Sequence, residues 1–105
     1  MNSITTSIEK AVLSSILFNP EEFEKINKIL KADDFSSSAH QKIYEVMQKL
    51  NEEEMPIVED FISKRLNNPK LNDVLIDILS ANPISKALAY AKEIKKDSLT
   101  REIQH

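Results

Sequence analysis

The chain has 105 residues, of which 41% are hydrophobic and 30% are charged, and its formal net charge is −3. This length and balance fit one folded domain rather than a disordered chain, and no apolar run approaches the roughly 20 residues that cross a bilayer. The sequence has no cysteine and no glycine, which excludes a disulfide framework, a thiolate metal site and the glycine-rich loops that bind nucleotide phosphates.

A first helix is predicted to begin at Thr6 and to end at Phe18. Thr6 and Glu9 have the spacing of a capping box, in which two side chains satisfy the free backbone N–H groups of a helix start. A second helix is expected after Asn19, a favourable N-cap residue that is followed by proline. Phe18 and Phe23, on either side of this cap, are expected to form a hydrophobic staple that fixes the angle between the two helices.

Residues 32–66 are predicted to form a loop, a helix, an acidic turn and another helix. Phe35 is expected to anchor the loop, and Ser38 and Gln41 have the spacing of a capping box at the next helix start. Asn51 is expected to end that helix in a left-handed conformation. The residues that we expect in the structural core of this stretch are Phe35, Ile43, Val46, Met47, Leu50 and Phe61.

The remaining sequence predicts two further helices. Asn68 and Pro69 are typical of a helix start, and apolar residues follow them at helical spacing. Residues 81–83 break this pattern, and a sixth helix is expected from Ile84, with a thin apolar stripe and no stop pattern before the last residue. The sequence therefore predicts an all-α fold, a small orthogonal bundle of about six helices of which the last is truncated.

No residue pattern is typical of a catalytic, cofactor-binding or metal site. A zinc site needs three or four ligands at set spacing, which His40 and His105 lack, so His40 is interpreted as a structural residue that is on the helix surface or half-buried. The carboxylates at residues 33–34 and 52–54 are expected to be solvated. Direct DNA binding by the domain is expected to be slight, because the chain is acidic overall. The candidates for a local basic patch are Lys92, Lys95, Lys96 and Arg101.

Several short motifs occur in a definite order along nearly the whole chain. They are Ala-Asp-Asp-Phe at residues 32–35, His40, Ile43-Tyr44, Met55-Pro56-Ile57, Asn82-Pro83, Ala89-Tyr90-Ala91 and Ile94. In this order they resemble the N-terminal domain of DnaB-type replicative DNA helicases. Two features depart from the family: Val58 stands where an aspartate usually caps the fourth helix, and residues 67–73 lack a glycine pair. Both departures concern loop conformation rather than the fold.

The resemblance implies one N-terminal head domain over residues 1–105, without catalytic activity or a cofactor of its own. In such helicases these domains form a collar, a trimer of dimers, which docks the C-terminal domain of primase, and a helicase loader is a further partner. ATP, magnesium and DNA unwinding belong to a C-terminal ATPase domain that this chain lacks. A cytoplasmic location is expected, since the absence of cysteine is consistent with a reducing compartment. The residues that we expect to form an interaction surface are Tyr90, Ile94, Leu99, Arg101 and Ile103.

Two alternatives remain. The helicase-binding domain of a primase is also a small helical bundle that is similar to this head, although the order of the motifs favours the helicase. An unrelated helical adaptor or DNA-binding bundle is the second alternative. A helix-turn-helix protein would need a basic recognition helix, whereas the two central helices are balanced or acidic.

Overall fold

The computed structural model describes residues 3–103, and the side chains of residues 4–102. Within this range the chain forms six α-helices and one short 3₁₀ helix, with no strand, which confirms the predicted all-α bundle. The elements are α1 (Ser3–Phe18), α2 (Glu22–Asn27), η1 (Ala32–Asp34), α3 (Ser38–Glu52), α4 (Glu59–Leu66), α5 (Pro69–Leu79) and α6 (Ala87–Ile103). The expected truncation of the last helix concerns its end at residues 104–105, which lie outside the described residues.

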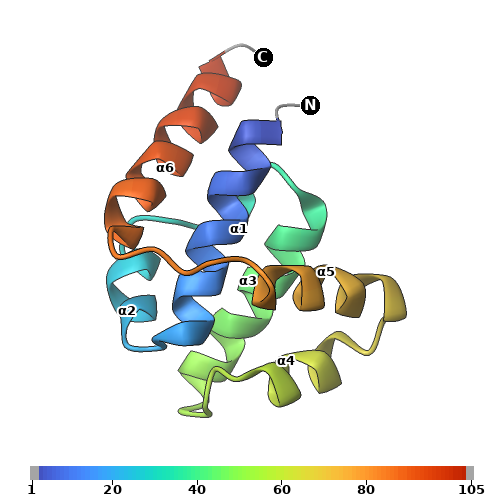
Figure 1. The fold of residues 1–105 in the computed structure, drawn as a ribbon. Coiled ribbons are helices and arrows are strands. Elements are labelled where there is room, and N and C mark those ends of the chain that lie inside the picture. Colours follow the sequence, from blue (N-terminus) through green and yellow to red (C-terminus); the bar gives the residue numbers. More distant parts are fainter. Residues whose placement is uncertain (1–2, 104–105) are drawn as a thin grey trace.

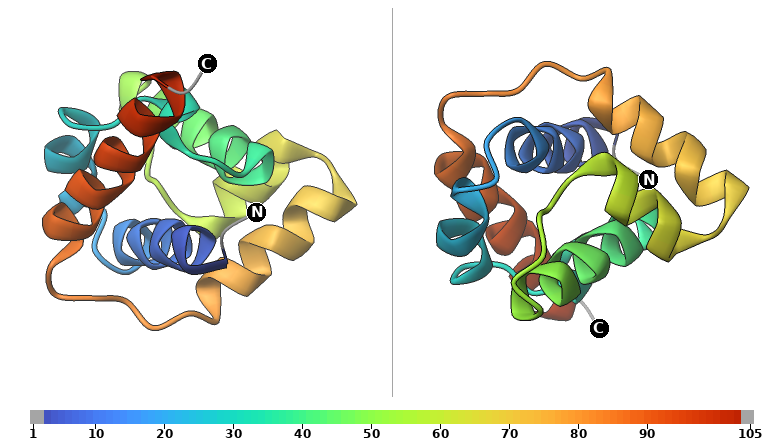
Figure 2. Two further views of the ribbon diagram at one scale, coloured as in Figure 1. Left: turned by 90° about the horizontal axis from the view of Figure 1, so that it is seen from above. Right: turned by 90° about the horizontal axis from the view of Figure 1, so that it is seen from below.

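Helix α1 runs through the middle of the bundle (Figure 1). Helix α6 lies beside it and runs in the opposite direction, so the start of α1 and the end of α6 are at the same end of the molecule. Helices α3 and α5 pack against other sides of α1, and α2 lies against α6 (Figure 2). Because α1 contacts most of the bundle, nearly its whole circumference is buried in its second half.

An aromatic cluster fills the centre of the core. The ring of Tyr44 lies 5.6 Å from that of Phe23 and 4.9 Å from that of Phe35, in tilted arrangements that aromatic pairs favour. The Tyr44 hydroxyl is satisfied as well, since it donates to the Leu30 carbonyl at 3.1 Å. Burial raises the pKa of Tyr44, so this hydroxyl stays protonated. The cluster therefore joins α2 and the loop after it to α3.

The six core residues expected from the sequence differ in their burial. Phe35, Ile43, Met47 and Leu50 are fully enclosed. Val46 and Phe61 are half-buried at the edge of the same core. The core also includes residues from the other helices and from two loops: Val12, Leu13, Ile16, Ile26, Leu30, Ile57, Ile62, Leu75, Ile78, Ala87, Ala91 and Ile94.

The helix ends in the second half of the chain follow local chemistry closely. Asn68 caps α5 as predicted, accepting hydrogen bonds from Lys70 N at 2.9 Å and Leu71 N at 3.2 Å, with Pro69 as the first helical residue. Asn67 ends α4 in the left-handed conformation, with φ 44°. The same role predicted for Asn51 is wrong, because α3 continues to Glu52.

The cap of α3 lies one residue earlier than expected. Ser37, not Ser38, accepts the hydrogen bond from His40 N at 3.3 Å. Gln41 does not complete a capping box and instead donates its side-chain N–H to the Phe35 carbonyl at 2.7 Å. A serine therefore caps α3 as predicted, but the prediction chose the wrong serine and a capping box that does not form.

The first two helices differ more from the prediction. Helix α1 begins at Ser3, so Thr6 lies inside the helix and does not cap it. Phe18 is 78% exposed while Phe23 is buried, so the predicted staple between them is absent. Asn19 contributes its carbonyl, which accepts from Glu22 N at 3.0 Å, rather than a side-chain cap.

Two serines of α1 hold the long connection between α5 and α6. Ser14 Oγ donates to the Ala81 carbonyl at 3.0 Å, and Ser15 Oγ accepts from Ile84 N at 2.9 Å. These hydroxyls interrupt an otherwise apolar stretch of α1 and satisfy loop backbone groups that α1 partly covers. They position the start of α6.

Candidate protein-interaction surface

A buried carboxylate, Asp34, fixes α6 to the turn before α3. Its Oδ1 accepts from Ser98 Oγ at 2.7 Å, its Oδ2 accepts from Lys31 N at 2.7 Å, and Lys95 Nζ lies 3.1 Å from Oδ2. The Arg101 guanidinium donates to the Asp34 main-chain carbonyl at 2.6 Å. Burial works to raise the pKa of Asp34, but the hydrogen bonds from Lys31, Ser98 and Lys95 outweigh it and hold the pKa below its usual value.

A second buried carboxylate, Glu9, fixes α1 to the same turn. Glu9 Oε2 accepts from both Ser36 N and Ser36 Oγ at 2.7 Å, and Glu9 Oε1 lies 2.8 Å from His40 Nδ1. Burial opposes ionisation here too, yet the bonds from His40 and Ser36 keep the pKa of Glu9 below its ordinary range. Residues 31–40 are thus held between two ionised carboxylates.

These two networks correct the sequence interpretation of three side chains. Asp34, expected to be solvated, is buried, and its neighbour Asp33 is exposed. His40, expected to be a structural residue on the helix surface or half-buried, is structural but fully buried, against Glu9. Glu9, expected in a helix cap, faces the core. The sequence did contain one indication: Glu9 lies on the apolar stripe of its helix, and a carboxylate in such a position needs a buried partner.

Both networks are structural. Every buried polar side-chain atom in the described part of the chain has a hydrogen-bond partner. None of the described residues form a group of three or more side chains suited to hold a metal ion. Nor is any helix within residues 3–103 long and apolar enough to cross a membrane. The two networks hold α1 and α6 against the turn before α3.

The interaction surface expected on α6 is only partly a surface. Ile94 is 1% exposed and belongs to the core, so its placement on that surface was wrong. Arg101 is half-buried and bound to the Asp34 carbonyl, which gives it a structural role. Tyr90 is 38% exposed and Leu99 47% exposed. The side chain of Ile103 lies outside the described residues.

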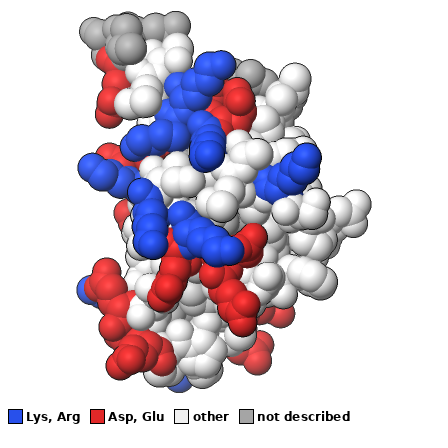
Figure 3. All heavy atoms as spheres, turned by 90° about the vertical axis from the view of Figure 1, so that its left-hand side faces the viewer, with Lys and Arg blue, Asp and Glu red and all other residues white. Residues whose placement is uncertain are grey.

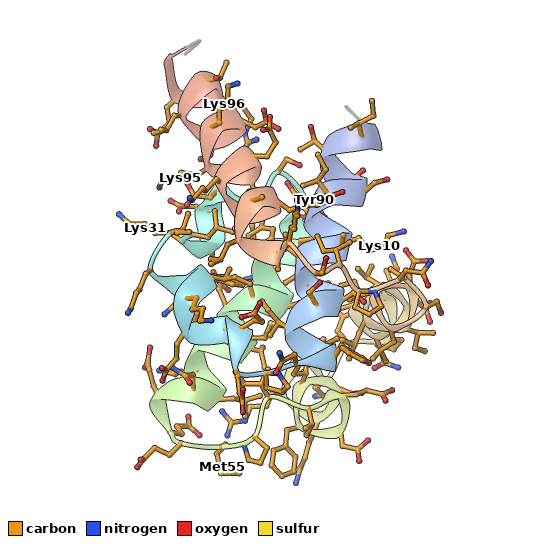
Figure 4. The ribbon with its side chains drawn as sticks, turned by 60° about the vertical axis from the view of Figure 1, so that its left-hand side comes forward. Lys10, Lys31, Met55, Tyr90, Lys95 and Lys96 are labelled. Carbon is orange, nitrogen blue, oxygen red and sulfur yellow. The ribbon has the colours of Figure 1, made fainter. Side chains whose placement is uncertain are left out.

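The two large apolar side chains exposed on α6, Tyr90 and Leu99, lie on different sides of the helix. Tyr90 faces the first turns of α1, where it lines a hollow of ≈ 280 Å³ with Ile4, Ser7 and Ile8. Leu99 faces the turn after α2 and, with Ile29, lines a separate hollow of ≈ 360 Å³. Figure 3 shows lysine and arginine side chains gathered over the α2 and α6 face, with acidic side chains mainly below them. Figure 4 shows Lys31, Lys95 and Lys96 on this side of α6, apart from Tyr90.

A third exposed apolar region lies at the opposite end of the bundle, beside the acidic turn at residues 52–54, which is exposed as expected. Met55 and Phe61 line a hollow of ≈ 340 Å³ together with Lys64 and Arg65. Arg65 is held by two hydrogen bonds to Glu53, at 2.6 and 3.1 Å. Met55 also lines a neighbouring hollow with Pro20 and Glu21 of the α1–α2 connection.

Comparison with known proteins identifies the family. The model of the DnaB-like helicase N terminal domain matches residues 2–96. The replicative DNA helicase DnaB of Helicobacter pylori strain J99 is 35% identical over 99 residues, which cover 92% of this chain and 20% of that helicase. The replicative DNA helicase DnaC of Bacillus subtilis is 29% identical over 102 residues, 90% of this chain and 22% of that protein. The chain thus spans about a fifth of the length of these relatives.

Solved structures agree with the sequence matches. The N-terminal domain of DnaB helicase from Helicobacter pylori, whose structure was described together with its interactions with primase, superposes with a TM-score of 0.84 at 32% identity. The match covers 98% of this chain and 89% of that one. The corresponding Mycobacterium tuberculosis domain has a TM-score of 0.82 at 22% identity, covers 91% of this chain and 74% of that one, and shares the fold. This chain belongs to the DnaB-like helicase N-terminal domain family.

Proposed function

We propose that this domain is the non-catalytic head of a replicative DNA helicase, which supports assembly of the helicase ring and docks the C-terminal domain of primase. The observation that carries the proposal is the likeness to the Helicobacter pylori domain over nearly its whole length, since that domain was described with its primase interactions. The described residues add a rigid surface helix, α6, which the buried Asp34 network and the α1 serines hold in place.

The proposal assigns no chemistry to the domain itself. In the whole helicase, ATP and magnesium would be bound by a separate ATPase domain, where a glycine-containing phosphate loop supplies the contacts that this glycine-free chain cannot make. Unwinding of DNA, contact with a helicase loader and a cytoplasmic location are parts of the same proposal. With a net charge of −3, the head would contribute little to DNA binding.

The collar role is proposed from the family rather than from a self-association surface on this domain. The large exposed apolar side chains of the described residues are spread over several elements: Ile4 and Phe18 near the two ends of α1, Met55 and Val58 before α4, Ile76 and Leu79 on α5, and Tyr90 and Leu99 on α6. A stable interface usually buries more than about 1,000 Å² around one apolar centre. The isolated domain should therefore sediment as a monomer at micromolar concentration.

Isothermal titration calorimetry with the C-terminal domain of primase from the same organism tests the docking role. We expect saturable binding to the purified domain. Leu99→Ala should weaken it, whereas Ile76→Ala should not, because Ile76 on α5 is equally exposed, at 48% against 47%, but lies away from α6. Absence of binding would refute the docking role. Binding that both variants leave unchanged would move the docking surface off the Leu99 side of α6.

A further inference from the structure

The α2–α6 groove is basic in a chain that is acidic overall. Six residues line it: Ile29, Lys92, Lys95, Lys96, Leu99 and Thr100. Lys31 lies at its edge, next to Lys95 (Figure 4). With a net charge of −3 over the chain, three lysines around one hollow make a concentrated positive field that would attract an acidic partner.

The three lysines that line the groove differ in whether their ammonium groups are already in an ion pair. Lys95 is half-buried and held by Asp34 at 3.1 Å, so its position is fixed. Lys92 and Lys96 are exposed, and neither forms an ion pair with another described residue. The two free ammonium groups are one helical turn apart, on the same face of α6. They can therefore contact two carboxylates without first breaking an internal ion pair.

The floor of the groove is apolar. Ile29 is half-buried in the turn directly after α2, and Leu99 is 47% exposed on α6, although a leucine is one of the residues most often enclosed. Along α6, Lys92, Lys95, Lys96 and Leu99 recur at positions i, i+3, i+4 and i+7 and so form one stripe. A basic rim around an apolar floor matches a helix that carries acidic residues beside leucine or a similar side chain.

Single-stranded nucleic acid fits this groove less well. Such sites combine a longer basic track with aromatic rings on which bases stack. The groove lining contains no aromatic residue, and Tyr90 lines the hollow on the other side of α6. A phosphate backbone would leave the apolar side chain of Leu99 exposed to solvent, whereas an amphipathic helix would bury it.

We propose that the α2–α6 groove docks an acidic amphipathic helix of a partner protein, with carboxylates on Lys92 and Lys96 and an apolar side chain on Leu99. The inference deepens the proposed function, and where it names primase it rests on that function: the helix would be the element by which the primase domain is held. Groove binding itself can be tested without primase.

The first experiment uses a synthetic 15-residue helical peptide with leucines at i, i+3, i+4 and i+7 and glutamates beside them. Amide chemical shifts of the ¹⁵N-labelled domain are followed as peptide is added. We expect shifts confined to Ile29 and to residues 92–100, and loss of binding as salt is raised from about 50 to about 500 mM. A scrambled peptide of equal charge and a 15-mer of thymidylate serve as comparisons. No binding, equal binding of the scrambled peptide, or stronger binding of the oligonucleotide at this groove would overturn the inference.

The second experiment compares two double variants of equal charge change. The double variant Lys92→Glu with Lys96→Glu reverses the charge of the two free lysines of the groove. The control, Lys42→Glu with Lys70→Glu, reverses the charge of two exposed lysines on α3 and α5. All four positions are exposed, so both variants should fold. We expect the first to weaken binding of the peptide, and of the primase domain, by about tenfold or more, and the second to leave both unchanged. If primase binds both variants like the wild type, the groove inference falls while the docking role stands. If primase fails to bind the wild type, the docking role falls, and the peptide titration still tests whether the groove binds an acidic amphipathic helix.

Discussion

Removal of the Glu9 carboxylate should strongly destabilise the domain, because this one buried side chain binds both Ser36 and His40. Glu9 is 0% exposed, accepts two hydrogen bonds of 2.7 Å from Ser36 and lies 2.8 Å from the buried His40 Nδ1. In Glu9→Ala, Ser36 is exposed and can bind water instead, but His40 stays buried without its partner and a cavity opens beside α1. Removing one member of a buried pair costs about 3–5 kcal/mol, so we expect a loss in that range.

Urea denaturation followed by circular dichroism measures this loss. Glu24→Ala is the matched control, because Glu24 is exposed on α2 and its removal should change stability by less than about 0.5 kcal/mol. The double variant Glu9→Met with His40→Leu should recover much of the lost stability, since apolar replacement of both partners leaves no unpaired polar group. A loss below about 1 kcal/mol in Glu9→Ala would refute the view that this carboxylate holds the turn.

Three further predictions follow from the same contacts. Phe35→Ala should cost about 3–5 kcal/mol in urea denaturation, because Phe35 is buried against Tyr44; a loss below about 1 kcal/mol would mean that the loop before α3 is not anchored there. Asn68→Ala should cost about 1 kcal/mol through loss of the α5 cap, and Asn72→Ala, which leaves this cap intact, should not reduce the helix-start protection seen by amide exchange. The pKa values of Glu9 and Asp34 lie below their ordinary values of 4.5 and 3.8, so the unfolded state takes up protons first as the pH falls. Their contribution to stability is complete near neutrality and is lost progressively below about pH 4.5; urea midpoints that stay constant from pH 7 to about pH 3 would contradict it.

Sequence reasoning succeeds here where the determining chemistry is local. Asn68-Pro69 specifies the start of α5 with neighbouring residues alone, and the structure has that cap. Three consecutive serines before α3 make the kind of cap predictable but not its register, because any of them can accept the N–H. Ser37 is selected by the position of the loop, which Glu9 holds from another helix.

The long-range pairings could not be read from the sequence. Asp34 meets Lys95 and Ser98 across more than sixty residues, and nothing in its neighbourhood distinguishes it from the exposed Asp33. The sequence also did not determine which face of α6 turns to the core, because the apolar stripe of this helix is thin. Ile94 turns to the core and Leu99 to solvent because Ser98, Lys95 and Arg101 attach α6 to the turn at Asp34.

Hydrogen–deuterium exchange of the domain, alone and bound to the primase C-terminal domain, tests the central claim most directly. If α6 is the docking helix, primase should slow exchange in residues 90–100 and at the end of α2, and should leave α5 unchanged. Slowed exchange around Met55 and α4, with none in α6, would contradict the account.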